Sequence, residues 1–241
     1  MLALLKGLLI FLSILAAPES SSAQDKKLTI NFTVHHMDSN EILYRGTERI
    51  TINESKYFKL NKYYDPTGKV VLEEETIYAT SDLKLHLYRY HNMQNDEKTF
   101  AQLEGNTLKV QYQKSPKDEL QKGTIEWTPS SIHGKTFLEF IVKNWTTVSA
   151  GKDLNFALAI PYRFDHINFR IRQTKVVESK DSPPLHYLAL EPQNFFLRTV
   201  APKISFIFSG GQQPKVKSFF GPTGLLVDGK QEETVRVDFQ Y

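Results

Sequence analysis

The 241-residue sequence contains no cysteine. This absence excludes disulfide scaffolds, cysteine-based zinc sites, iron–sulfur clusters, thiol catalysis and a lipid-modified N-terminal cysteine. The net charge is only +3, from 30 Lys and Arg against 27 Asp and Glu. An excess of charge this small does not indicate a nucleic-acid partner. A chain of this length buries enough surface to fold without a cross-link or a structural metal.

Long apolar runs are also absent after the first residues. Lys6 precedes a mostly apolar run at 7–17, and small residues follow at 21–23, where a signal peptidase cleaves. The run is shorter than the roughly 20 residues that span a bilayer. We therefore predict that residues 1–23 are a cleavable secretory signal peptide rather than a membrane anchor, and that the mature chain has no membrane span.

Export combined with the lack of cysteine narrows the expected compartment. Secreted animal and plant domains commonly carry disulfides, whereas a bacterial periplasmic protein need not. Sequons for N-glycosylation occur at Asn31, Asn53 and Asn144. The pattern is short enough to recur by chance and matters only in a eukaryotic secretory pathway. We therefore predict a periplasmic location.

Residues 24–241 are predicted to form a single all-β domain, because apolar and polar residues alternate along many short runs. Tight turns are expected at 65–68 (Asp-Pro-Thr-Gly) and at 105–106 (Gly-Asn), each joining two strands of a hairpin. This spacing favours an antiparallel sheet over βαβ units. Alternation is clearest at 28–35, 83–87, 108–112, 167–172 and 235–241, and further strands are expected at 58–64, 70–78, 100–104, 107–113, 123–128, 154–160, 175–178, 186–190, 204–208 and 216–220.

One segment has a helical period instead. Its apolar residues recur at intervals of three and four: Phe137, Phe140, Ile141, Trp145 and Val148. The polar residues Glu139, Lys143 and Thr147 fall on the opposite side. This pattern predicts an amphipathic helix over about 136–149 that ends near Gly151, with Trp145 toward the sheet. Another hairpin is the alternative, since Val142, Thr146 and Thr147 favour strands.

The fold class follows from the need to cover the apolar face of the sheet. A sheet with one apolar face must close on itself, fold over or accept a helix. We predict a mainly β protein with a strongly curved antiparallel sheet or open barrel, and with the helix at about 136–149 against its concave side.

No pattern in the sequence indicates a catalytic, metal or cofactor site. Neighbouring histidines such as His35 and His36 point to opposite faces of a strand. There is no Gly-x-Ser-x-Gly, Ser-x-x-Lys or His-Glu-x-x-His motif. Within the run 73–75, alternation directs the middle glutamate away from its two neighbours, so no acid–base pair follows, and the glycines at 210–211 are typical of a hairpin loop. We predict no catalytic, metal or cofactor-binding residue, no cofactor and no enzymatic activity.

The aromatic residues suggest a binding site of another kind. The chain contains 16 Phe, 11 Tyr and 2 Trp, and many occupy the inward phase of predicted strands. Two interpretations stay open: a filled β core, or an apolar cavity between sheet and helix of the kind that β-barrels provide for lipid-like ligands. The residues expected to line such a cavity are Phe137, Phe140, Ile141, Trp145, Phe156, Phe169 and Phe206.

The second half of the chain resembles exported bacterial proteins of uncharacterised function. The resemblance rests on Pro-Gln-Asn-Phe-Phe-Leu-Arg at 192–198, Pro-Lys-Ile-Ser-Phe at 202–206, Phe-Gly-Pro at 220–222 and the terminal Val-Arg-Val-Asp-Phe. The layout of such proteins is similar to that of periplasmic lipoprotein carriers, with a signal peptide, a curved antiparallel sheet and a helix over an apolar cavity. The resemblance implies fold and compartment, and it transfers no catalytic residue.

Three functions are compatible with these patterns. The first is a periplasmic, non-enzymatic protein that binds or carries a lipid or another apolar small molecule. The second is a structural or protein-interaction module that pairs with another protein of the cell envelope through an exposed strand edge. The third, a hydrolase, would need carboxylates and a histidine from distant strands to converge on one point.

Overall fold

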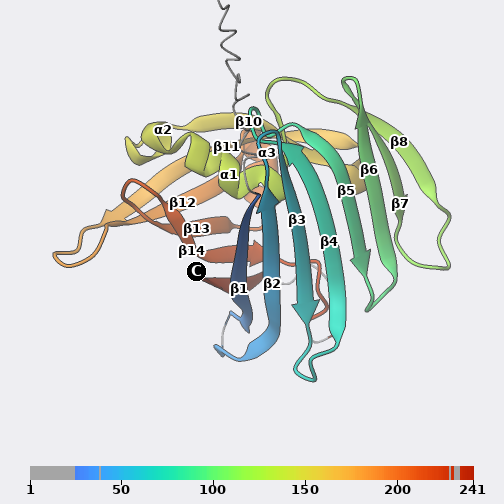
Figure 1. Cartoon of the computed structure of the whole chain (residues 1–241), viewed down its shortest axis with the longest axis horizontal. Helices are drawn as coiled ribbons and strands as arrows, with labels where there is room; N and C mark the ends of the chain where they lie inside the picture. The colour runs from blue at the N-terminus through green and yellow to red at the C-terminus, as the bar shows by residue number, and fades with distance from the viewer. Residues whose placement is uncertain (1–24, 38, 228, 231–233) are drawn as a thin grey trace, which may run out of the picture.

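The computed structural model describes residues 25–37, 39–227, 229–230 and 234–241. They form one large curved sheet with a few short helices (Figure 1). The predicted signal peptide at 1–23 lies outside the described residues. Among the residues that are described, no helix is long and apolar enough to cross a membrane.

The elements follow one another in a nearly continuous series of strands. The strands are β1 (Lys26–His36), β2 (Ile42–Ile52), β3 (Lys56–Tyr64), β4 (Val70–Ala79), β5 (Leu85–Asn92), β6 (Glu97–Glu104), β7 (Thr107–Gln113), β8 (Gln121–Glu126), β9 (Ser131–His133), β10 (Leu154–Ile160), β11 (Asp165–Val177), β12 (Leu185–Pro192), β13 (Ile204–Ser209), β14 (Lys215–Pro222) and β15 (Thr234–Gln240). The helical elements are η1 (Gly134–Thr136), α1 (Phe137–Lys143), α2 (Trp145–Ser149), η2 (Pro161–Arg163) and α3 (Phe195–Val200).

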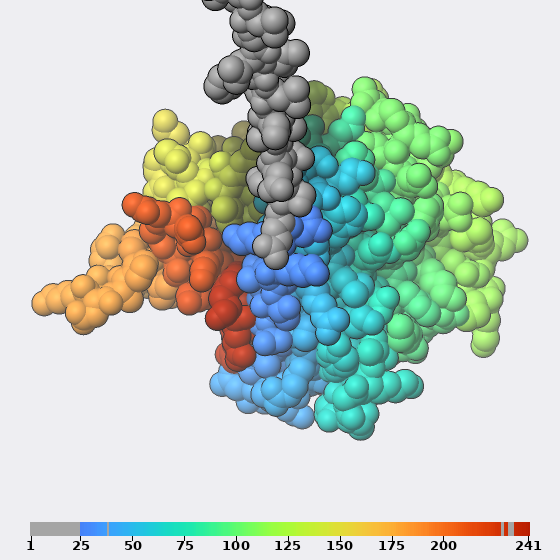
Figure 2. Space-filling view, viewed as in Figure 1, coloured from blue at the N-terminus to red at the C-terminus, as the bar shows by residue number. Residues whose placement is uncertain are grey.

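All described strands belong to one sheet, in the order β8-β7-β6-β5-β4-β3-β2-β1-β15-β14-β13-β12-β11-β10-β9. Every pair is antiparallel except β9 and β10, which are parallel. The first and last strands pair in the middle of the sheet, where β1 lies beside β15 (Figure 2). The two edge strands, β8 and β9, are consecutive in the chain. The sheet is therefore an open, barrel-like sheet, as the alternation predicts.

Side chains rather than backbone hydrogen bonds close the gap between the two edges. The chain turns at η2, which contacts β6 and β7 across the gap. Phe164 follows with a left-handed backbone, φ 54°, and packs into the apolar cluster of β5 to β8. Its ring lies against Gly123 of β8, where a Cβ would sit 2.4 Å from the ring. Only glycine gives the ring this space.

The helical segment lies between the two halves of the sheet (Figure 1). Its buried residues Phe137, Ile141 and Val148 pack against the concave face of the C-terminal half. Its polar residues face the N-terminal half, where Glu139 pairs with Lys59 of β3 and Lys143 donates to the Ser81 carbonyl. The predicted helix is thus confirmed, although it is divided into α1 and α2 at Asn144 and its polar side is covered as well.

Most of the predicted strands and both predicted hairpin turns are present. The differences have local causes. Leu83 has φ 62° and ends a turn, so β5 begins only at Leu85. The runs at 167–172 and 175–178 are one strand, β11, with a bulge between Gln173 and Lys175. Strands β2 and β9 and helix α3 were not predicted.

Gly123 offers a test of how the sheet closes. Gly123→Ala places a methyl group against the Phe164 ring and should lower the free energy of unfolding by about 1–3 kcal/mol, as overpacking does in a filled interior. Urea unfolding monitored by circular dichroism measures the change. Gly134→Ala is the matched control, since a Cβ there meets nothing within 4 Å. Equal stability of the two variants would contradict side-chain closure of the sheet.

Candidate functional site

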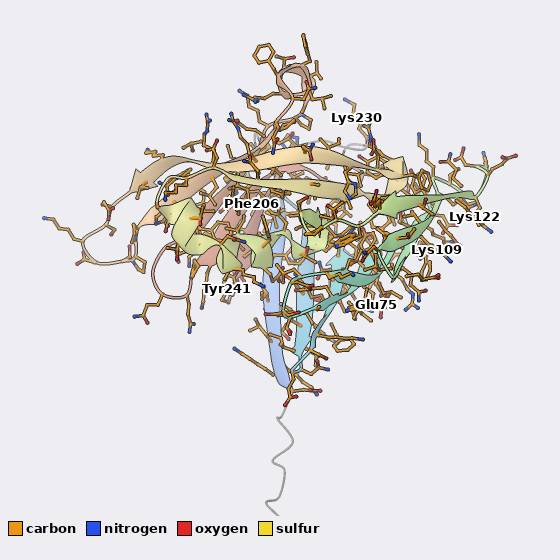
Figure 3. The ribbon with its side chains drawn as sticks, turned by 90° about the horizontal axis from the view of Figure 1, so that it is seen from above. Glu75, Lys109, Lys122, Phe206, Lys230 and Tyr241 are labelled. Atoms are coloured by element: carbon orange, nitrogen blue, oxygen red, sulfur yellow. The ribbon has the colours of Figure 1, made fainter. Side chains whose placement is uncertain are left out.

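The seven residues predicted to line an apolar site come together in one cluster. Phe137, Ile141, Phe156, Phe169 and Phe206 are buried members of the core between the helix and the C-terminal half of the sheet. Phe140 and Trp145 are partly buried and pack against it. The helix supplies four of the seven residues and strands β10, β11 and β13 supply the rest (Figure 3 labels Phe206).

The rings in this cluster touch one another. The centroid of Phe137 lies 5.6 Å from that of Phe156 and 5.0 Å from that of Phe206. Phe140 meets Phe156 edge-on at 5.4 Å. These are ordinary distances for packed aromatic pairs. Helix and sheet are therefore held together here mainly by packed aromatic rings, and Phe140 is only partly buried.

The other side of the same helix faces a buried ionic network. Lys59 Nζ lies 2.5 Å from Glu48 Oε1 on β2 and 2.9 Å from Glu139 Oε1 on α1, and it also donates to the Lys135 carbonyl at 3.2 Å. Lys59 and Glu48 are buried. Burial alone would lower the pKa of Lys59, but the carboxylates of Glu139 and Glu48 raise it above its ordinary value, so the ammonium stays charged.

A second ion pair extends the network toward β5. Lys135 contacts Glu74 on β4, and Glu74 Oε1 accepts a hydrogen bond from the Tyr88 hydroxyl at 3.0 Å. Burial and the nearby carboxylate raise the pKa of Tyr88 well above its ordinary value, and burial raises the pKa of Tyr63 to about 12. Both phenols are therefore neutral at physiological pH. The part of the N-terminal half that faces the helix is therefore polar and ion-paired, whereas the rest of its interior holds two apolar clusters.

Some polar atoms of this interior lack a hydrogen-bond partner of normal geometry within the described residues. They are Asn61 Oδ1, the Tyr78 hydroxyl and Glu139 Oε2. Burial and the neighbouring Glu139 raise the pKa of Tyr78 far above its usual range. An apolar ligand placed here would not supply the hydrogen bonds that these buried groups lack. This side of the helix is therefore poorly suited to an apolar ligand.

The imidazole of His133 lies beside the ionic network. Its ring packs on Tyr88, with 4.3 Å between centroids, and its Nδ1 accepts from the Lys135 amide at 3.3 Å. Burial, with a smaller contribution from Lys135, lowers its pKa to about 3. Tyr88 thus contacts both His133 and Glu74. All three side chains are buried, and among the described residues no hydrogen bond or ion pair joins His133 to a carboxylate, so the convergence that the hydrolase hypothesis requires is not shown.

Sequence reasoning missed this network. The alternation at 73–75 correctly separated Glu74 from its neighbours, since Glu73 and Glu75 pair at the surface with Lys62 and Arg89. It did not reveal that Glu74 points inward. The available signal was a charged residue in the inward phase of a strand, repeated on neighbouring strands by Glu48 and Lys59.

The outer face of the sheet carries an open groove of about 420 Å³ over β4 to β7. Its walls include Glu75, Arg89 and Phe100, and Arg89 pairs with Glu75 at 2.6 Å while lying over the Phe100 ring. On the opposite half of the molecule, Arg170 is held by Glu191 and Asp153. The arginines named on these two surfaces are thus paired with neighbouring carboxylates.

Lys59 provides a test of the ionic network. Lys59→Met keeps the length of the side chain but leaves Glu48 and Glu139 buried beside each other without a cation. We expect a loss of about 3–5 kcal/mol in the free energy of unfolding. Lys62→Met, on the same strand, breaks the exposed pair with Glu73 and should cost about 0–1 kcal/mol. Similar losses in urea unfolding for the two variants would contradict a buried network.

His133 predicts a pH dependence of stability. Its folded pKa of about 3 lies below the ordinary value of 6.5, so the unfolded chain binds more protons between these values. Stability should therefore fall as the pH drops from about 6.5 toward 3, by at most about 1.4 kcal/mol per pH unit from this group. His133→Gln should flatten the urea midpoint against pH, whereas His91→Gln at the surface should not. Parallel profiles for wild type and His133→Gln would refute the assignment.

No family model matches the chain, and no curated protein matches it. Its fold is similar to a crystal structure described as a beta-barrel-like protein of the domain of unknown function DUF1849 from Brucella abortus, with a TM-score of 0.47 and 11% sequence identity. The match covers 90% of this chain and 95% of that chain. The resemblance to exported bacterial proteins and to periplasmic lipoprotein carriers stays a prediction.

Proposed function

We propose that this is an exported, non-enzymatic protein of the bacterial periplasm that binds a lipid-like apolar ligand between α1–α2 and the C-terminal half of the sheet. The observation that carries the proposal is the single cluster of aromatic side chains at this interface. The apolar run at 7–17 and the small residues at 21–23 support export.

The two sides of the helix differ in a way that favours one direction of opening. Toward the N-terminal half the helix is fixed by the ion pairs of Lys59 and Lys135. Toward the C-terminal half the contacts of the helix are mainly with apolar side chains, and an acyl chain can replace contacts of that kind. Each methylene that leaves water contributes about 0.8 kcal/mol. Binding would therefore separate helix from sheet on the apolar side and leave the ionic side intact.

The break between α1 and α2 gives the helix a place to bend. Asn144 ends α1, and its side-chain amide donates to the Phe140 carbonyl at 2.9 Å. Trp145 begins α2 and packs against His186 and Phe208, with centroid distances of 4.9 and 5.6 Å. Trp145 and Phe140 lie at the partly exposed rim of the cluster, where a ligand would enter.

The two tryptophans allow a direct test. Trp127 belongs to the cluster of the N-terminal half and Trp145 to the proposed site. In Trp127→Phe, brominated palmitate should quench the remaining fluorescence by at least half at saturation, and unbrominated palmitate should compete. In Trp145→Phe, the same titration should leave the fluorescence of Trp127 within about 10% of its starting value.

Native mass spectrometry of the protein recovered from periplasmic extract completes the test. We expect a lipid of stoichiometric mass to accompany the wild-type chain. Equal quenching of the two variants, or no quenching together with no co-purifying lipid, would overturn the proposed function. Recovery of the protein from the cytoplasmic fraction alone would overturn the proposed location.

A further inference from the structure

Helix α3 exposes its apolar side chains to an unusual degree. The exposed fractions are 67% for Phe195, 78% for Phe196, 42% for Leu197 and 79% for Val200. The other large apolar residues exposed in the described part of the chain are spread over separate elements, and none exceeds 51%. Scattered exposure of that kind is normal, whereas a contiguous apolar patch marks an interaction surface. Four such residues within six positions form a patch, which we call the α3 tip.

The α3 tip is held in place from its base. Asn194 Oδ1 accepts hydrogen bonds from the amides of Phe196 and Leu197 at 2.9 and 3.2 Å. The Arg198 guanidinium donates to the carbonyls of Pro192 and Gln193 at 3.2 and 3.1 Å. The connection between β12 and β13, which carries α3, stands out from the rest of the ribbon (top of Figure 3). The exposed rings therefore belong to an ordered projection.

The α3 tip lies on the outer side of the sheet, away from the apolar cluster. Arg198 lies 3.9 Å from Glu191, which also binds Arg170 on β11. Arg170 and Phe169 point to opposite faces of that strand, and Phe169 belongs to the inner core. The tip is therefore a surface distinct from the ligand site, and it does not depend on that proposal.

The charge around the tip is positive. From position 192 to position 227 the sequence contains no Asp or Glu, and Arg198 and Lys203 lie within or just after α3. On the adjoining outer face, Arg170 and Arg172 share the carboxylates Glu191 and Asp153. Because those two arginines are paired with carboxylates, the excess positive charge near the tip comes from Arg198 and Lys203. A partner that takes up apolar side chains and also carries negative charge fits this surface.

We propose that the α3 tip docks this protein on an anionic phospholipid bilayer, with Phe195, Phe196 and Val200 entering the interfacial region and Arg198 and Lys203 meeting phosphates. A helix that binds a protein groove presents apolar residues along one stripe. Here Phe195, Phe196, Leu197 and Val200 together cover about half of the circumference of the helix, more than one stripe. Exposure on several sides suits a fluid apolar medium that can surround the projection.

The test uses residues 24–241, which carry the whole sheet, so that the apolar N-terminal run cannot bind lipid. Sedimentation with vesicles of phosphatidylcholine and phosphatidylglycerol at 3:1 should recover the wild type. Phe195→Ser/Phe196→Ser should lower the partition coefficient at least tenfold. Met93→Ser/Leu120→Ser removes two exposed apolar side chains elsewhere and should change it less than twofold. Circular dichroism and urea midpoints equal to wild type would show that the variants fold.

The electrostatic part is measured separately. Lys203→Glu, vesicles of phosphatidylcholine alone and 0.5 M salt should each weaken binding several-fold, since charge at an exposed surface is screened by salt. The proposal is overturned if wild type does not bind the anionic vesicles or if the double phenylalanine variant binds as wild type does. It is also overturned if the tip substitutions leave vesicle binding unchanged and abolish only the binding of a stoichiometric protein partner from the envelope.

Discussion

The position of the helix depends on the buried ammonium of Lys59. It lies between Glu48 on one strand and Glu139 on the helix, so it connects the N-terminal half of the sheet to the segment that covers the C-terminal half. Buried ion pairs add little net stability compared with apolar packing, because desolvation opposes the attraction. Their geometry is demanding, however. We therefore interpret the network as the interaction that fixes the position of the helix on the sheet.

The ion pairs on one side and the apolar packing on the other give the two halves of the interior different properties. The N-terminal half presents neutral tyrosines and paired charges to the helix, whereas the C-terminal half presents aromatic and aliphatic side chains. A buried charge that loses its partner costs much free energy, whereas the exchange of one apolar contact for another costs little. The helix can therefore separate from the C-terminal half of the sheet while it stays bound to the N-terminal half.

Alternation predicted the sheet, turn residues predicted two hairpins, and a spacing of three and four predicted the helix, because all of these are local patterns. Strand β2 was missed because its inward positions include Gly46 and Glu48, so the alternation is broken. Helix α3 was missed because its six residues are too few for a helical period to stand out; the capping residue Asn194 was the remaining signal.

The seven apolar site residues could be predicted for a similar reason. Each lies on the apolar side of a predicted strand or helix, and the apolar sides of neighbouring elements pack together in any layered fold. The network of Glu74, Lys59 and Lys135 was not predicted, because a charged residue at an inward position of a strand is taken as solvated until its distant partner is known. Pairing between residues 76 positions apart, as between Lys59 and the Lys135 carbonyl, leaves no local pattern.

The pairing of β1 with β15 has a consequence for how the molecule is made. Asn31 lies opposite Gln240, so the sheet acquires its central contact only when nearly the whole chain is available. Contacts between residues so distant in sequence form late, since the intervening loop must close first, and proteins dominated by them fold slowly. Until then both β1 and β15 expose an unpaired edge that can join another chain. The chain is therefore most prone to edge-to-edge aggregation while β1 and β15 are not yet paired, and protection of those edges by a chaperone would matter most at that stage.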